Sequence, residues 1–325
     1  MTKEEFENVN CKNINVNEKA EISPLSHEMV FTNIKASQIQ LDTLFMLLAE
    51  IGKDTDNPNE RNYMLTADQF MKLKHYSSLK DARKTMKESV LGDEKKGTKL
   101  THIDVTIRND AYDYIRVVNW FSWAEYRDGA LRFCLTPEVK KALVEMKEND
   151  DYKIFASLKY LLPMNSQYSK QIYLMCKNYV TSGKMYAMNF DEFCNTLGIG
   201  EGYSLSKIKT RILDKAKEEI NLLSDITIDY NIEEISYRGG KRAESISFTI
   251  TKKNKKVIKE NMSEMAKRME MLNKKNSEKK KTVHKATTSN NQSTNKTANN
   301  FHNFNQRDYD FDKIEREWLK GSYSS

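Results

Sequence analysis

Hydrophobic residues recur along this chain at two spacings, one typical of helices and the other of strands. Leu41, Leu44 and Leu48 keep one face of a helix apolar, because residues three and four apart share a face. In "THIDVTI" (101–107) every second residue from Ile103 is apolar, as in a half-buried strand. The chain therefore combines helices with strands.

The first half predicts helices followed by a hairpin. The segments "LTADQFMKLKHY" (65–76) and "SSLKDARKTMKESV" (77–90) predict two helices with almost no linker between them. Two later segments, "YIRVVNWFSWAEY" (114–126) and "ALRFCL" (130–135), flank the turn signal Asp128-Gly129 and predict a hairpin. Thr136 then caps another helix, which has Pro137 at its first position. The aromatic residues of this hairpin are expected to pack in a core rather than to form an interface.

The second half repeats this order after a charged break. Helices are expected at 152–162 and 167–181, and a short helix follows Asn189. A long helix then covers "LSKIKTRILDKAKEEI" (205–220), and two alternating strands end the pattern. Helix, short helix, turn, long helix and hairpin is the order of a winged helix. The predicted fold class is therefore α+β, with tandem winged-helix domains at 25–148 and 150–253.

Three appendages flank these domains. Residues 1–24 are polar and unpatterned, and they predict a flexible arm. Residues 254–300 are basic and then rich in Ser, Thr and Asn, which predicts a low-complexity linker. Residues 301–325 restore aromatic residues and predict a docking motif for a partner protein, helical when bound. Its candidate contact residues are Phe304, Tyr309, Phe311, Ile314, Trp318 and Leu319.

The positive charge of the chain is concentrated outside the predicted domains. The net charge is +7, but residues 251–285 hold thirteen Lys/Arg against four Asp/Glu. The first 250 residues hold 35 Lys/Arg against 37 Asp/Glu. A case for DNA binding must therefore rest on where the cations lie rather than on how many there are.

The long helix of the second domain is the first candidate for DNA contact. Its apolar residues gather on one side, and cations and small hydroxyl residues gather on the other, where Arg can bind guanine and Ser or Thr can reach bases or phosphates. The candidate residues are Tyr203, Ser204, Ser206, Lys207, Lys209, Thr210 and Arg211. A solvated amphipathic helix is the alternative, and Glu218 and Glu219 favour it.

Two further groups of cations extend the candidate DNA surface. Arg238, Lys241 and Arg242 stand at the turn of the second hairpin, where a wing touches the DNA backbone or the minor groove. The second helix of the first domain adds a weaker set, and dimerisation through the first domain is an open alternative. This weaker set is Ser78, Lys80, Arg83, Lys84 and Lys87.

Catalytic and metal-binding patterns are sparse. The sequence has no G-x-x-x-x-G-K-[ST] loop and no paired histidines, which disfavours a P-loop ATPase and a metal-dependent nickase. No cofactor and no catalytic residue is expected. Four cysteines without ligand spacing predict reduced thiols, and the sequence contains neither an export signal nor a membrane-spanning segment. A cytoplasmic, non-enzymatic protein is therefore expected.

Several segments resemble the initiator replication proteins of theta-replicating, iteron-bearing plasmids. They are "VVNWFSWAEYRDGALRFCLTPEVKKAL" (117–143), "YSKQIYLMCKNY" (168–179), "FDEFCNTLGIGEGYSLSKIKTRILDKAKEEIN" (190–221) and "ISFTITKK" (246–253). The resemblance covers about 30–253 and implies tandem winged helices that bind repeated origin sites. It also implies a dimer that represses its own gene and a monomer that initiates. The closing "NFNQRDYDFDKIEREWL" (303–319) resembles a short tail of replication proteins from low-GC Gram-positive bacteria and their phages.

The leading hypothesis is a plasmid replication initiator. It would bind origin repeats, help to open the origin and recruit host replication-initiation or helicase-loading proteins. One alternative is a transcription regulator with the same tandem domains and no role in replication. A DNA-nicking replication enzyme is the third hypothesis.

Overall fold

The computed structural model describes residues 9–22, 36–53, 57–76, 78–92, 99–109, 114–148, 154–200, 202–237, 240–261 and 263. All of these belong to one compact unit, Met1–Met269. Most of the predicted linker 254–300 and all of the predicted docking motif 301–325 lie outside the described residues.

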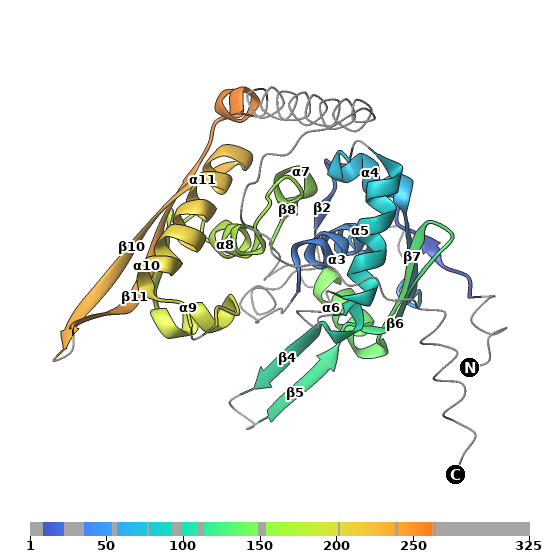
Figure 1. Cartoon of the computed structure of the whole chain (residues 1–325), viewed down its shortest axis with the longest axis horizontal. Coiled ribbons are helices and arrows are strands. Elements are labelled where there is room, and N and C mark those ends of the chain that lie inside the picture. The colour runs from blue at the N-terminus through green and yellow to red at the C-terminus, as the bar shows by residue number, and fades with distance from the viewer. Residues whose placement is uncertain are drawn as a thin grey trace, which may run out of the picture. The chain divides into compact units, whose positions relative to one another are not determined.

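In the first half, helices interrupt the strands of one sheet along the sequence, and Figure 1 labels α4, α5, β6 and β7 of this part. In the described residues its order is β1-β3-β7-β6, and β3 pairs antiparallel with β7. The helices α4 and α5 lie between β3 and β6 in sequence, as expected for a winged helix. The elements are β1 (Lys12–Asn13), β2 (Glu21–Ile22), α3 (Gln38–Ile51), β3 (Asn62–Thr66), α4 (Ala67–Lys74), α5 (Leu79–Leu91), η1 (Leu100–His102), β4 (Asp104–Asn109), β5 (Tyr114–Asn119), β6 (Phe121–Arg127), β7 (Ala130–Leu135) and α6 (Pro137–Glu148).

The segment 114–126 forms two strands rather than the single strand that the sequence predicts. Its first part, β5, pairs with β4, whereas β6 pairs with β7 in the other sheet. Trp120 separates them: it is buried, and its backbone N–H donates to the carbonyl of Ile103 at 2.8 Å. Trp120 and Phe121 are core residues, as expected for the aromatic residues of the hairpin, whereas Trp123 and Tyr126 are only half-buried.

The second half repeats the order of strand, short helix, long helix and hairpin. Its three-stranded sheet, counted over the described residues, has the order β10-β11-β9. The helix predicted at 152–162 is shorter in the structure: among its described residues, 154–162, α7 is the helical part, and the strand β8 precedes it. The elements are β8 (Ala156–Ser157), α7 (Leu158–Leu161), α8 (Gln167–Lys177), β9 (Lys184–Asn189), α9 (Phe190–Thr196), α10 (Leu205–Ile208), η4 (Lys209–Leu213), α11 (Asp214–Leu223), β10 (Ile226–Tyr237) and β11 (Gly240–Lys252).

The expectation of a flexible arm at 1–24 is wrong for residues 9–22. These residues pack on the domain: β1 pairs in parallel with β3, and β2 pairs with β8. Ile14, Val16 and Ile22 are buried, so three apolar side chains anchor a segment that is otherwise polar. Glu50 adds an ion pair with Lys12 at 3.3 Å.

A buried cluster of charges connects α3, α4 and α8. Asp42 forms ion pairs with Lys74 at 2.8 Å and with Lys170, and the side chains of Asp42 and Lys170 are fully buried. Burial lowers the pKa of Lys170 to about 8, and the neighbouring Asp42 carboxylate offsets part of that effect. Lys74 also donates to the carbonyl of Leu162 at 2.6 Å. An acid shared by two cations thus takes the place of apolar packing at this point.

Candidate nucleic-acid interface

The candidate interface of the second half begins with two capped helices. Asn189 caps α9 by accepting hydrogen bonds from the N–H groups of Asp191 and Glu192. Ser204 caps α10 by accepting from the N–H of Lys207. The connecting turn passes through Gly198, whose φ of +65° lies in the left-handed region that favours glycine. These short-range signals fix the start of the long helix.

The long helix, residues 205–223, is called here the recognition helix. It contains a π-helical turn, η4, at Lys209–Leu213, where the N–H of Asp214 donates to the carbonyl of Lys209. A wheel at 100° per residue does not reveal such a turn, although π-turns are frequent at functional sites. Thr210 and Arg211 are neighbours and both exposed, whereas Ile212 and Leu213 are neighbours and both buried.

The predicted DNA-contact residues at the start of this helix are mostly exposed. Lys209 differs: it is half-buried, and its Nζ lies 2.8 Å from Glu234 Oε1 of β10. Thr210 Oγ1 donates to the carbonyl of Ser206 at 3.0 Å. The exposed residues are Tyr203, Ser204, Ser206, Lys207, Thr210 and Arg211. Neither Lys207 nor Arg211 forms a side-chain ion pair with another described residue.

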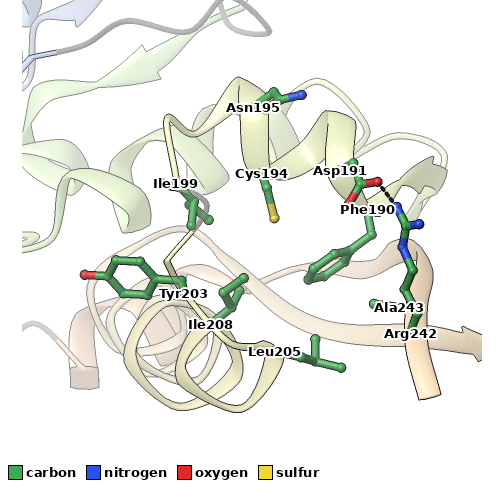
Figure 2. A pocket seen from close by; sticks show the side chains of 11 residues that line it. Phe190, Asp191, Cys194, Asn195, Ile199, Tyr203, Leu205, Ile208, Arg242 and Ala243 are labelled. Carbon is green, nitrogen blue, oxygen red and sulfur yellow. Dashed lines mark hydrogen bonds and ion pairs between the residues drawn. The ribbon is translucent and has the colours of Figure 1, made fainter. Parts of the chain in front are cut away.

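The hairpin β10–β11 lies beside the recognition helix as a wing does (Figure 1). Of the three predicted cations, Arg238 lies outside the described residues, and only the backbone of Lys241 is described. Arg242 is exposed and forms an ion pair with Asp191 of α9 (Figure 2). An acidic residue on the neighbouring helix therefore holds this cation.

A hollow of about 540 Å³ lies between α9, the turn and the start of the recognition helix. Its lining mixes apolar side chains such as Phe190 and Ile208 with polar ones such as Asn195 and Arg242, and the Cys194 sulfur points into it (Figure 2). Burial raises the pKa of the Cys194 thiol to about 11, so this thiol stays protonated at neutral pH. Tyr203, whose side chain is 41% exposed, stands at its edge.

Models of one protein family match both halves of the chain. The model described as "Initiator Replication protein, WH1" matches residues 25–177, and "Initiator Rep protein, WH2" matches residues 189–250. The chain belongs to the initiator replication protein family. The tandem winged helices predicted from the sequence are therefore confirmed.

One solved structure has the same fold as this initiator replication protein. The crystal structure described as Pi initiator protein in complex with iteron DNA matches it with a TM-score of 0.55 and 18% identity. The match covers 74% of this chain and all of that one. None of the curated proteins matches the chain.

In the first half of the initiator, the weaker set of predicted DNA-contact residues lies on α5 and at its N-cap. Ser78 caps this helix by accepting from the N–H groups of Lys80 and Asp81. Lys84 lies 3.8 Å from Glu88, a loose ion pair on the same helix. The four cations of the set, Lys80, Arg83, Lys84 and Lys87, are all exposed.

Arg83 connects α5 to the hairpin of its own domain. Its guanidinium lies against the Asp128-Gly129 turn, so close that a Cβ on Gly129 would be 3.3 Å from Arg83 Nε. Both turn residues have positive φ, +51° and +76°, as a tight two-residue hairpin requires. The first half therefore also sets a helix with exposed cations beside a short hairpin.

Metal-binding and membrane features are absent from the part of the chain that the structure describes. No three His, Cys, Asp or Glu side chains meet there in a way that would hold a metal ion. No helix in that part is long and apolar enough to span a bilayer. The predicted partner-binding residues Phe304, Tyr309, Phe311, Ile314, Trp318 and Leu319 lie outside the described residues.

Proposed function

We propose that this initiator binds repeated sites, iterons, in the double-stranded DNA of a plasmid origin and so starts replication. The observation that carries the proposal is the exposed face of Lys207, Thr210 and Arg211 at the capped start of the recognition helix. Cations and a small hydroxyl residue at that place suit entry into a major groove. The Pi initiator adds support, because it has the same fold and its crystal structure is a complex with iteron DNA.

The two halves of the chain have different roles in the proposed DNA binding. Residues 150–253 form the main DNA-binding domain, because the recognition helix and the wing both carry cations there. Residues 25–148 contribute α5 as a second contact and the surface for a homodimer in equilibrium with the monomer. The dimer represses the gene of the initiator, and the monomer opens the origin. The protein acts without catalysis, in the cytoplasm, and needs no cofactor.

The C-terminal motif completes the proposal. Residues 301–325 dock onto a host replication-initiation or helicase-loading protein, at the end of a tether of some forty polar residues. Deleting 301–325 should leave melting temperature and iteron affinity unchanged while plasmid maintenance fails. A clear fall in melting temperature, or normal maintenance without the motif, would contradict docking.

A replication assay tests the proposed function. The gene is cloned with its upstream DNA into a plasmid that lacks an origin, and maintenance in a host is scored. Maintenance that requires both the gene and direct repeats of about twenty base pairs beside it supports the proposal. Repression of a reporter without maintenance would favour a transcription regulator. Metal-dependent cleavage of one strand of the supercoiled plasmid would favour a nicking enzyme.

A further inference from the structure

Thr210 occupies a distinct place on the recognition helix. It lies on the exposed face between Lys207 and Arg211, and it belongs to the π-helical turn η4. Its hydroxyl donates to the carbonyl of Ser206 at 3.0 Å. The hydroxyl proton is therefore used within the helix, and the γ-methyl group is the apolar part of this exposed side chain.

We propose that the γ-methyl group of Thr210 contacts the 5-methyl group of a thymine in the major groove of the bound DNA. This rests on the proposed function. Thymine alone among the bases presents a methyl group in the major groove, and an apolar side-chain group is what recognises it. Because the Thr210 hydroxyl donates its proton to the helix backbone, it can accept a hydrogen bond but not donate one to a base, and the γ-methyl group supplies the apolar contact.

The neighbouring residues fit this role. Lys207 and Arg211 flank Thr210, are exposed, and form no ion pair with another described residue. Both are donors, so they suit phosphate oxygens or the acceptor atoms of guanine on either side of the thymine. Within the π-turn Ile212 and Leu213 are buried, whereas Thr210 and Arg211 are exposed. The helix thus presents one apolar contact between two cations.

The test combines a change in the protein with a change in the DNA. Each thymine of one origin repeat is replaced singly by deoxyuridine, which lacks the 5-methyl group. The dissociation constant of each duplex is measured for the wild type, Thr210→Ser and Thr210→Val. Serine keeps the hydroxyl and its bond to Ser206 but loses the methyl group. Valine keeps the methyl group and loses the hydroxyl.

One thymine should show coupling to residue 210. At that position deoxyuridine should weaken wild-type binding about fourfold, the factor that burial of one methyl group supplies. Thr210→Val should keep this sensitivity, and Thr210→Ser should lose it while its melting temperature stays unchanged. A purely structural role for Thr210 would weaken binding to every duplex alike.

Two contrary results are distinguishable. In the first, the wild type binds the repeat specifically, but deoxyuridine weakens binding by Thr210→Ser as much as binding by the wild type at every position. This result rejects the methyl contact and leaves the proposed function standing. If the wild type binds the repeat no better than random DNA, the proposed function is rejected, and the contact is rejected with it.

Discussion

Lys209 Nζ of the recognition helix lies 2.8 Å from Glu234 Oε1 of the wing strand β10. Both side chains are about one-third exposed, so the pair contributes little to stability. Its consequence concerns the proposed DNA binding, because Glu234 neutralises Lys209, one of the predicted contact residues. The same arrangement recurs where Asp191 pairs with Arg242. In the free protein, acidic side chains thus compete with DNA for two of the candidate contacts.

Glu234→Gln should strengthen binding to all DNA sequences and steepen its salt dependence. Lys209 then becomes available to a phosphate, and each such contact adds about 0.9 to the slope of log K against log salt. Asp229→Asn is the matched control, since it removes the same charge from β10 next to Lys217. Fluorescence anisotropy on random DNA at several salt concentrations measures both. Equal changes in the two variants would mean that only net charge matters.

Arg211→Ala should weaken binding to the origin repeat by about 1–3 kcal/mol and relax the preference at one base step. The reason is the exposed position of Arg211 next to Thr210 at the start of the helix. Competition assays with single-base variants of the repeat measure the preference. Lys184→Ala, an exposed cation of β9, controls for loss of charge. Equal losses on the repeat and on random DNA would assign Arg211 to a phosphate.

The fold was predictable wherever its signals were local. The cap residue Asn189 and the apolar periodicity within single helices placed the short helix and the long helix after it correctly. The order of elements in both halves followed from these signals. The prediction of a helix at 152–162 was wrong at its start, because residues 156–157 pair as a strand with β2, which lies more than 130 residues away in the sequence.

Long-range pairing explains the other misses. Residues 9–22 looked unpatterned because Ile14, Val16 and Ile22 stand among polar residues, and their burial depends on distant strands. The ion pair of Lys209 with Glu234 depends on the register of β10 against β11, which local periodicity does not specify. The candidate contact face was predictable, but its acidic partners were not.

Replacing Arg238, Lys241 and Arg242 by Ala should lower affinity for all sequences. Each lost phosphate contact should remove about 0.9 from the slope of log K against log salt. The triple variant therefore measures the contribution of the wing to this slope apart from that of the recognition helix. The single variant Asp191→Asn should act in the opposite direction, because it releases Arg242 from its ion pair. An unchanged slope in the triple variant would show that the wing does not touch DNA. Lys252→Ala, at the other end of β11, is the control.

The charge cluster around Asp42 makes a prediction about stability. Asp42→Asn should lower the free energy of unfolding by about 3–5 kcal/mol, because it leaves two buried or nearly buried cations without their anion. Lys170→Met should cost less, since Asp42 keeps its ion pair with Lys74. Urea denaturation measures both variants. A smaller loss in Asp42→Asn than in Lys170→Met would contradict the shared-acid arrangement.

The pH dependence of stability tests the same cluster independently. Burial lowers the pKa of Lys170 to about 8, below the ordinary value of 10.5 that it regains on unfolding. Between these values the unfolded chain binds more protons than the folded chain, so stability should rise with pH from about 8 toward 10.5. Below pH 8 both states are protonated, and the contribution of Lys170 should not change. Lys170→Met should lose the part of this rise in stability that Lys170 contributes. Burial also lowers the pKa of Lys253 to about 8, so Lys253 should contribute the same rise in stability to the wild type and to the variant. Urea midpoints from pH 7 to 10 measure the difference between wild type and variant, and parallel curves would mean that Lys170 does not titrate in this range.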